Sequence, residues 1–460
     1  MRRILAGMVA VALLMSAAVA FVGVSAVGAP PALSDVEEDA DSWTIMVYLC
    51  GDNNLEPAGL ADFVEMETAG STGDVTVIVL MDTFTALEGT HWYVVDDAGY
   101  NHVSPDSHDC DCADILGVDE CPGELDMGDG ATLTYFLVNA VEFAPADNYM
   151  LVLWDHGGGW RGVCWDDSTL IEVTPGVFWS SRLTTPETAA AIVAAEDEMD
   201  FKIDIIGYDA CLNGAIEVVY ENRDIADYMF ASVNLVPWDG MNYTAILEAV
   251  EGDPGAEMLD IGKAIVDSYV EFYANVNSLT GPGLEYFGDV TLSFFQLGQP
   301  AEDLAMSVDA LASELIDGGY ATDPGYRGAI SSAESQTPRI PTYMGEQMPF
   351  VDLGLFADKL GDYIPDLQKL ADAVVAGVDA VVLYENHIIT PGGAVLRTSG
   401  ISVMFTWCNE WLNPQYQLET LAEAETFGST LYWGMAFVVD THWDEFVFTF
   451  CMTDEPLTMD

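Results

Sequence analysis

Short apolar runs rich in β-branched residues recur along the first half of this chain, and segments with helical periodicity separate them. Such runs are typical of parallel strands that are buried on both faces, with the intervening helices packed against the sheet. The runs are Thr44–Leu49, Val75–Met81, Tyr149–Trp154, Ile203–Tyr208 and Tyr228–Val233. The pattern predicts an α/β fold with a parallel-rich sheet covered by helices on both faces.

The second half of the chain, from about residue 241, contains longer helical stretches and fewer apolar runs. We expect helices over Ala256–Ala274, Ala301–Ile316 and Phe356–Val378, with strands at VTLSFFQL and SGISVMFTW. Spacing alone does not decide whether this half is a separate domain or extends the sheet.

The N-terminal segment has the charge order of a secretory leader. Arg2 and Arg3 precede an apolar run from Ile4 to about Pro31, and an acidic stretch follows. We predict a signal peptide over residues 1–29 and an acidic linker over 30–42. Because the run is also long enough to span a bilayer, an uncleaved membrane anchor is the alternative. Either way, we expect the protein to be secreted or anchored at the cell surface.

Acidic residues far outnumber basic ones. The chain has 76 Asp and Glu against 12 Lys and Arg, a formal net charge of −64. Such a surface repels phosphate backbones, so nucleic acid is excluded as a partner. It indicates a halophilic or cation-rich setting, the alternative being an ordinary acidic secreted protein, and it attracts cationic substrates.

Eight cysteines are present, and in an exported protein some of them are expected to pair. Cys110, Cys112 and Cys121 are close enough in sequence for a local disulfide, although free thiols are the alternative. A zinc site is the weaker interpretation, because the C-x-C-x8-C spacing lacks the usual C-x2-C pair.

Two predicted strands end in residues that carry chemistry. LVLWDHGGGW places His156 before three glycines, on a turn where backbone N–H groups can face a bound group. GYDACLNG places Cys211 at a strand-to-helix junction, where helix N-terminal N–H groups would favour the thiolate. If these strands are neighbours, both residues reach one edge of the sheet and form a Cys–His dyad that suits acyl transfer.

At these residues the sequence resembles the clostripain-like cysteine peptidases, which share a caspase-like fold with gingipains and legumains. The resemblance rests on WTIMVYLCGDNNLE, LVLWDHGGGW and IDIIGYDACLNGAIEV, with FVDLGLFADKL and HWDEFVFTF further along. It implies a cysteine endopeptidase with Cys211 as nucleophile and His156 as general acid and base. It also implies an oxyanion hole formed by the N–H groups of Gly157 and Cys211.

The same resemblance implies protein or peptide substrates that are cut after Arg or Lys, with Asp209 and Asp239 as acids of the primary specificity pocket. Paired carboxylates would bind a guanidinium through charge-assisted hydrogen bonds. Asn213 and Met241 stand where relatives often have Met and Trp. Because some relatives cut themselves between the His and Cys blocks, we expect self-cleavage after Arg182, which we place in a polar loop; Lys202 is disfavoured beside a core strand.

We therefore divide the mature chain into a caspase-like core over 43–240 and an α/β extension over 241–460 that completes the peptidase unit. No cofactor is needed for the expected chemistry. Some relatives depend on calcium, and residues 106–130 are rich in the carboxylates that calcium prefers, though without EF-hand spacing. The alternative function is a catalytically silent, caspase-like binding or surface-structural protein.

Overall fold

The computed structural model describes most of the chain after residue 40, within one compact unit that spans residues 39–460. The described residues are 41–85, 89–95, 111–117, 123–174, 176–276, 290–341, 347–388, 398–405, 408 and 432–452. The predicted leader and the linker up to residue 40 lie outside them. No helix within these ranges is long and apolar enough to cross a membrane.

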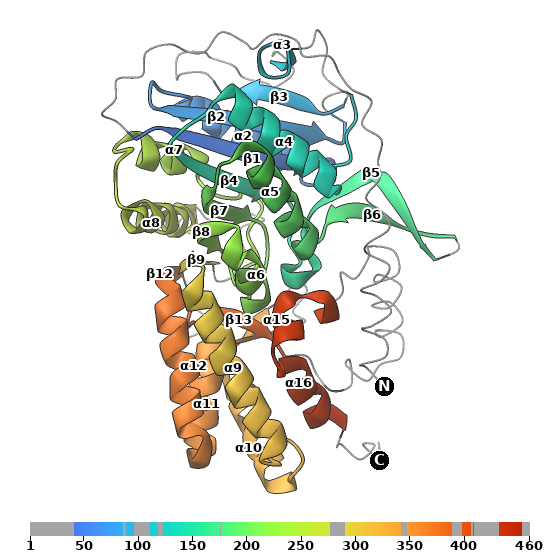
Figure 1. Cartoon of the computed structure of the whole chain (residues 1–460), viewed down its shortest axis with the longest axis vertical. Helices are drawn as coiled ribbons and strands as arrows, with labels where there is room; N and C mark the ends of the chain where they lie inside the picture. Colours follow the sequence, from blue (N-terminus) through green and yellow to red (C-terminus); the bar gives the residue numbers. More distant parts are fainter. Residues whose placement is uncertain are drawn as a thin grey trace. The chain divides into compact units, whose positions relative to one another are not determined.

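An eight-stranded sheet forms the centre of this unit (Figure 1). Its order is β12-β9-β8-β7-β4-β1-β2-β3, and the five strands from β8 to β2 are parallel to one another. The strands are β1 (Trp43–Gly51), β2 (Val75–Thr83), β3 (His91–Val94), β4 (Asn148–Trp154), β7 (Ile203–Asp209), β8 (Ala226–Ala231), β9 (Val290–Gln296) and β12 (Val382–Ile388). The α/β class with a parallel-rich sheet is thus confirmed, and antiparallel strands stand at both edges.

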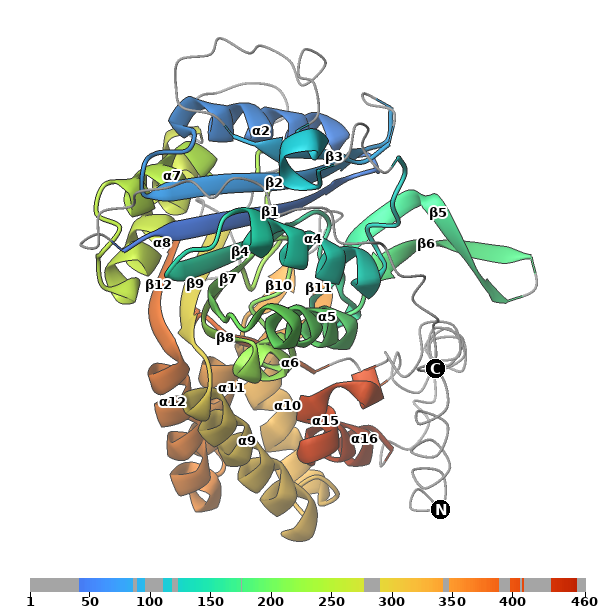
Figure 2. The ribbon, with the colours of Figure 1, turned by 45° about the horizontal axis from the view of Figure 1, so that its top comes forward.

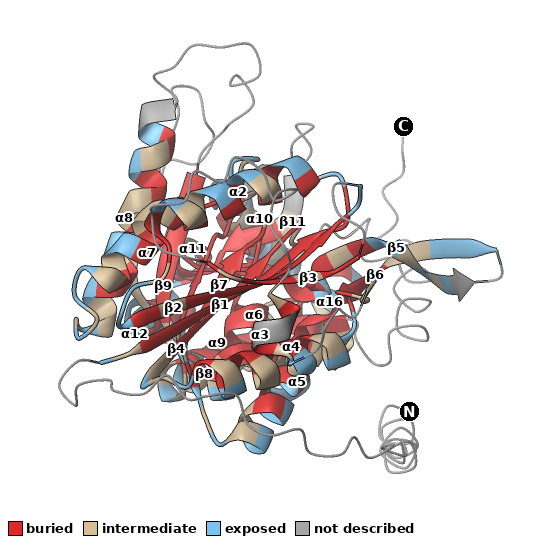
Figure 3. Ribbon diagram, turned by 90° about the horizontal axis from the view of Figure 1, so that it is seen from above, coloured by how far each residue is buried: buried red, intermediate tan, exposed pale blue. Residues whose placement is uncertain are grey.

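Helices cover both faces of the sheet because alternate residues of each strand enter two separate hydrophobic cores. One core contains Val47 and Val79 of the strands with α2, α7 and α8, and the other contains Tyr48 and Leu80 with α4, α5 and α6. Figure 2 shows α2 on one side of the sheet and α4 and α5 on the other. These helices are α2 (Glu56–Ala69), α4 (Gly130–Phe143), α5 (Thr185–Met199), α6 (Ile216–Glu221), α7 (Tyr243–Glu251) and α8 (Met258–Val276). In Figure 3 the central strands are buried along most of their length.

Strands from the second half complete the same sheet, because β9 pairs with β8 and β12 pairs with β9. A group of helices continues beyond this edge of the sheet (Figure 1). Besides α7 and α8, the described helices of the second half are α9 (Gln299–Asp317), α10 (Pro324–Gln336), α11 (Leu353–Tyr363), α12 (Gln368–Val381), α15 (Ala436–Asp440) and α16 (Trp443–Met452). A small sheet of β10 (Arg339–Pro341), β11 (Gln347–Asp352) and β13 (Ser402–Met404) lies among them.

The expected helix over Phe356–Val378 is wrong as a single element. It is divided into α11 and α12 by a short 3-10 turn at Pro365–Leu367. Proline lacks the N–H that an α-helix needs in its interior, so the chain turns there and a new helix begins.

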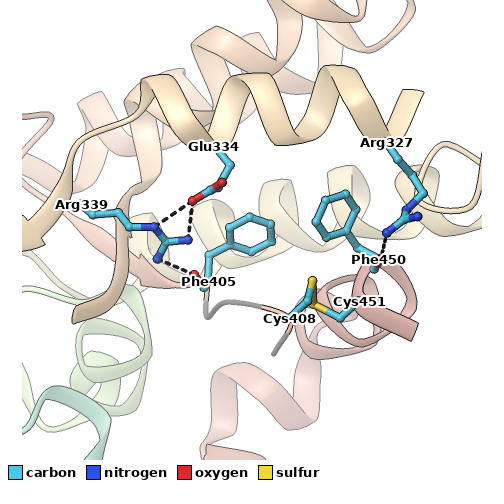
Figure 4. The surroundings of a disulfide bond; sticks show 7 residues. All are labelled: Arg327, Glu334, Arg339, Phe405, Cys408, Phe450 and Cys451. Atoms are coloured by element: carbon cyan, nitrogen blue, oxygen red, sulfur yellow. Dashed lines mark hydrogen bonds and ion pairs between the residues drawn. A yellow bond between two sulfur atoms is a disulfide. The ribbon is translucent and has the colours of Figure 1, made fainter. Parts of the chain in front are cut away.

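One disulfide joins Cys408 to Cys451 across 43 residues of sequence (Figure 4). Nearby, Arg339 binds Glu334 and donates to the carbonyl of Phe405, while Arg327 donates to that of Phe450. The expected local pairing is confirmed only in part. Cys112 is disulfide-bonded, but the other two cysteines of its cluster lie outside the described residues.

Candidate active site

The two sequence blocks expected to carry chemistry end on neighbouring strands. β4 and β7 pair in parallel, and Trp154 stands opposite Asp209 at their carboxyl ends. His156 follows Trp154 by two residues and Cys211 follows Asp209 by two, so both reach the same edge of the sheet. The expectation that these strands are adjacent is confirmed.

Gly157 brings the two strand ends into direct contact. A Cβ atom at this position would lie 2.2 Å from the carbonyl oxygen of Cys211 and 2.4 Å from its nitrogen, distances that no side chain tolerates. Only glycine allows the backbone after His156 to pass this close. A hydrogen bond from the Gly157 N–H to the Cys211 thiol is among the influences that lower the pKa of that thiol.

The imidazole of His156 is held by a neighbouring segment that follows β1. Its Nε2 lies 3.0 Å from Oδ1 of Asn54. The adjacent Asn53 donates to Oδ1 of Asp155 at 2.7 Å, and the Trp165 N–H donates to the other oxygen of that carboxylate. Burial lowers the pKa of His156, with the Asp167 carboxylate opposing the shift, so the neutral imidazole dominates near neutrality.

The thiol of Cys211 is covered in this structure by the segment after β8 (234–242). The N–H of Val236 donates to its Sγ at 3.3 Å. Burial raises the pKa of Cys211 to about 11 despite this donor. Burial thus favours the neutral form of both the thiol and the imidazole.

The expected helix N-terminus at Cys211 is wrong. Helix α6 begins at Ile216, and Leu212 has a positive φ of 70° in the turn that precedes it. Because the influence of a helix dipole falls off within its first turn, the end of α6 does not favour the thiolate of Cys211. The donors that face the sulfur come instead from Gly157 and Val236.

Two carboxyl groups lie together beneath Gly240, and we call Asp62 and Asp209 the pocket pair. Oδ2 of Asp62 accepts from the indole of Trp154 at 2.6 Å, and Oδ2 of Asp209 accepts from the Met241 N–H at 3.1 Å. A Cβ on Gly240 would lie 2.7 Å from the first of these oxygens and 2.9 Å from the second. Both acids therefore approach the same backbone position.

The pocket pair is too closely spaced and too deeply buried to carry two charges. Burial, reinforced by Asp209, raises the pKa of Asp62 to about 10, and burial raises that of Asp209 to about 7. Two carboxyls in such contact titrate together and keep one proton between them near neutrality.

Asp239, the other expected pocket acid, is exposed on the segment above the pocket pair. Its charge is one of the influences that raise the pKa values of Asp62 and Glu65, so it lies within electrostatic reach of both. Glu65 joins this segment to α2, because its Oε2 accepts from the Tyr243 N–H at 3.0 Å. The structure thus brings Asp209 and Asp239 to one region.

Arg182, the expected self-cleavage residue, lies in a strand rather than in a loop. It belongs to β6 (Val177–Leu183), which pairs with β5 (Val163–Thr174) in a two-stranded hairpin. Figure 1 shows this hairpin projecting from the body of the molecule, but Arg182 stands near its base and is 5% exposed. Its Nε donates to the carbonyl of Arg161.

A second group of acids lies beyond the end of β1, and we call it the edge cluster. Each of Asp52, Asp82, Glu124 and Asp166 offers an oxygen, and these four oxygens lie within 4.8 Å of one another. Glu124 comes from the acidic segment in which calcium ligands were expected, whereas the other three come from outside it. The three aspartates are fully buried.

Several residues of the site carry no sequence signal of their own. Asn53 and Asn54 belong to the motif WTIMVYLCGDNNLE, but nothing in the sequence places them beside Asp155 and His156. Asp62 is one of several acids on α2, and it lies on the buried face of that helix. Its place beside Asp209 depends on the packing of α2 against the ends of β4 and β7, which only the fold supplies.

Comparisons with known proteins bear on most of the chain. The sequence model of the clostripain family matches residues 47–448. Clostripain of Hathewaya histolytica is 27% identical over 239 residues, which are 47% of this chain and 44% of that protein, so the match spans less than half of the relative's length.

Solved structures show the same fold. A secreted C11 cysteine protease from Bacteroides thetaiotaomicron, in complex with an irreversible peptide inhibitor, has a TM-score of 0.55 at 19% identity, covering 88% of this chain and 99% of that one. An inactive zymogen C11 protease from Parabacteroides distasonis has a TM-score of 0.56 at 17% identity, covering 90% and 99%.

Proposed function

Because this chain belongs to the clostripain family of cysteine peptidases, we propose that it hydrolyses peptide bonds after Arg or Lys through Cys211 and His156. The observation that carries the proposal is the contact of the two strand ends, where the His156–Gly157 backbone packs against the backbone of Cys211. A nucleophile and a base on adjacent strand ends are the arrangement that acyl transfer requires.

The reaction begins when His156 takes the proton of the Cys211 thiol and Sγ attacks the carbonyl carbon of the substrate. The resulting oxyanion is stabilised by the backbone N–H groups of Gly157 and Cys211. The imidazolium then protonates the leaving amine, which departs as the C–N bond breaks. His156 next removes a proton from water, whose oxygen attacks the thioester, and the released acid leaves Cys211 protonated again.

Asn54 acts as a positioning residue for this cycle. Its Oδ1 contacts Nε2 of His156, which limits rotation of the ring before substrate arrives. Proton transfer requires heavy atoms within hydrogen-bond reach, so a ring that turns freely would lower the rate.

We propose that substrate displaces the Val236 segment from the sulfur. The Val236 N–H that now faces Sγ is the type of backbone group to which an extended peptide also binds. Substrate binding would thereby uncover the nucleophile, which is otherwise a buried, protonated thiol.

The basic side chain of the substrate is proposed to bind between Asp209 and Asp239. A guanidinium entering there meets the negative charge of these acids and forms charge-assisted hydrogen bonds with them. Asp62 also contributes to binding. It holds a proton before substrate binds, and a bound cation would expel that proton. Binding of Arg would then release up to one proton.

Turnover of fluorogenic peptides ending in Arg, Lys, Asp or Leu tests the proposal. We expect cleavage after Arg and Lys by the parent and none by Cys211→Ala, measured at low and high salt. If cleavage depends on Cys211 but occurs only after Leu or Asp, the chain is a cysteine peptidase but Asp209 and Asp239 do not bind a basic side chain. No cleavage by processed parent protein would favour the alternative, a catalytically silent binding protein.

Self-cleavage after Arg182 remains a proposal with a structural requirement. Its guanidinium lies over the ring of Trp165 and its backbone is part of β6, so the base of the hairpin must open before the bond reaches a second active site or its own. Intact mass of Arg182→Gln should stay that of a single chain, while the control Lys202→Gln is cut like the parent. If the parent is cut and Lys202→Gln is not, self-cleavage occurs after Lys202 and not after Arg182.

Export is proposed from the leader-like N-terminus and from the disulfide between Cys408 and Cys451. Structural disulfides persist in oxidising compartments outside the cytoplasm. Secretion and a membrane anchor differ in where the mature protein is found, so fractionation of the native source separates them. The acidic surface supports a halophilic setting, which predicts a folded state that is more stable in molar KCl.

A further inference from the structure

Two buried thiols meet in the core behind the active site, and we call Cys50 and Cys164 the thiol pair. Cys50 lies near the end of β1, and Cys164 lies at the start of β5. Both side chains are fully buried in the same hydrophobic core. Among the described residues, they are the only cysteines besides Cys211 that are not in a disulfide. The proposed catalytic cycle uses neither of them.

A hydrogen bond joins the two thiols to each other. Burial raises the pKa of both thiols, and the bond adds to this shift at Cys50 but opposes it at Cys164. These directions are those expected when the Cys50 thiol donates to the sulfur of Cys164. Two cysteines can be bridged only if their side chains point toward each other. The thiol pair meets this requirement, because its sulfur atoms are already in contact.

The backbones that carry the thiol pair are held side by side. The side-chain nitrogen of Asn53 donates to the carbonyl of Cys50 at 3.3 Å and to the carbonyl of Trp165 at 2.9 Å. One amide nitrogen therefore lies between the two backbones, next to both cysteines. A further bond runs from the Asp167 N–H to the carbonyl of Asp52 at 2.9 Å. A disulfide requires backbones this close, with Cα atoms roughly 4.4–6.8 Å apart.

Cys164 also has a backbone conformation that few side chains adopt. Its φ is 60°, and among the described residues other than glycine only Asp200 and Leu212 share a positive φ. Asp200 ends helix α5, where a left-handed residue is common, and Leu212 follows the nucleophile. A left-handed cysteine inside a strand persists only where its surroundings fix it. A covalent bond at its sulfur would be such a constraint.

We propose that Cys50 and Cys164 form a disulfide in the mature protein, a proposal that rests on the proposed export and not on peptidase activity. The oxidant is a disulfide of the exporting compartment, which reacts before β5 closes over β1. The thiolate of one cysteine attacks it, forming a mixed disulfide and releasing one thiolate. The other cysteine attacks the mixed disulfide, which forms the S–S bond and expels the second thiolate. The thiol pair thus loses two protons and two electrons, and the oxidant is reduced to two thiols.

The disulfide would fasten the base of the β5–β6 hairpin to the central sheet. Cys164 is followed by Trp165, which pairs with Arg182 in β6, whereas Cys50 belongs to a central strand. The base of the hairpin has to open before the bond after Arg182 can enter any active site. The disulfide opposes this opening, so it should slow cleavage after Arg182 by any protease.

Differential alkylation tests the bond on the full chain carrying Cys211→Ala, which makes the result independent of catalysis. Protein exported by an expression host is labelled with iodoacetamide in urea, then reduced and labelled with N-ethylmaleimide. We expect the maleimide on both cysteines of the thiol pair and on Cys408 and Cys451, the internal control. Iodoacetamide on the thiol pair alone would overturn the proposal.

The same labelling after refolding from urea with glutathione disulfide separates the bond from export. Here too we expect the maleimide on Cys50 and Cys164, and the digest made without reduction should contain their two peptides joined. If the pair stays reduced while Cys408 and Cys451 are oxidised, the proposal is wrong even though the protein has folded.

Melting temperatures of Cys50→Ala, Cys164→Ala and the double variant, in the same background, give a second readout. A bond between residues 50 and 164 closes a long loop, so each variant should melt about 5 °C below the oxidised parent. The double variant should melt like the single ones, because either change removes the same bond. Losses that add in the double variant would indicate two packed thiols without a bond.

Limited digestion with trypsin measures the opening of the hairpin. Trypsin cuts after Lys and Arg, of which the chain has only 12. Cleavage after Arg182 should be at least fivefold faster in the double variant than in the oxidised parent. Cleavage after Lys202, which is exposed and distant from the hairpin in sequence, is the control and should be unchanged. Equal rates after Arg182 would refute the effect on the hairpin.

Discussion

The pocket pair and the edge cluster both consist largely of buried acids near the carboxyl ends of the strands, yet the protein satisfies their oxygens differently. Each acid of the pocket pair accepts a hydrogen bond from the protein, from Trp154 or from Met241. In the edge cluster, Oδ1 of Asp52 and Oδ2 of Asp82 are buried without a hydrogen-bond partner. Protons relieve repulsion in both groups, because burial raises the pKa of Asp62 to about 10 and that of Asp82 to about 8.

A proton can leave when a substrate cation arrives, so the pocket pair suits a binding site that fills and empties. The following predictions test this behaviour.

Asp209→Asn should have the largest effect. It removes the charge that a substrate guanidinium would meet, and the expected loss in kcat/KM for an Arg peptide is about 100- to 1000-fold. Turnover of an Arg peptide and a Leu peptide by both proteins measures it. Equal losses for both peptides would assign Asp209 a structural role.

Asp62→Asn should change the pH dependence of specificity. In the parent, the ratio of kcat/KM for Arg to that for Leu should rise by up to about tenfold per pH unit above pH 6, because binding expels the shared proton. The variant keeps an acceptor for Trp154 but lacks the acid that holds a proton above pH 7, so its ratio should rise less steeply with pH than that of the parent. Because His156 and Cys211 act on both peptides, their titration cancels in the ratio. If the ratio changes with pH in the same way in the parent and in Asp62→Asn, substrate binding does not release a proton from Asp62.

Stability should fall as pH rises, because of the pocket pair. The pKa values of Asp62 and Asp209 are raised to about 10 and about 7, so the folded state holds protons that the unfolded state has lost above roughly pH 4. Stability is therefore present at low pH and is lost as pH rises toward these values, by about 1.4 kcal/mol per pH unit for each group. Urea unfolding of Cys211→Ala at pH 5–8 measures the slope.

The control for that slope is Asp62→Asn in the same background. It removes one of the two titrating groups. The slope of the free energy of unfolding against pH should therefore be smaller by about 1.4 kcal/mol per pH unit. Glu217, a distant buried acid whose pKa is raised to about 7 by burial, should keep its share in both proteins. An unchanged slope would show that the pocket pair does not hold the proton.

Much of the architecture could be predicted from the apolar runs. All five strands expected from the apolar runs of the first half are present. A strand buried on both faces has to be apolar throughout, and the sequence shows this directly. The missed strands β3, β5, β6, β10, β11 and β12 are shorter, more polar or at edges, where one face meets solvent or another chain segment. The start of α6 was also missed, because Leu212 takes a left-handed turn that no propensity indicates.

The sequence by itself determined the α/β class, the strand-end positions of His156 and Cys211, and membership of a peptidase family. These follow from local pattern and from blocks of contiguous residues. Only the tertiary structure decided that Asp62 lies against Asp209, that Asn54 holds the His156 ring, and that four separated acids meet at Asp82. The reason is physical: each of these contacts joins residues far apart in sequence, and their energies depend on burial and distance, which no single segment specifies.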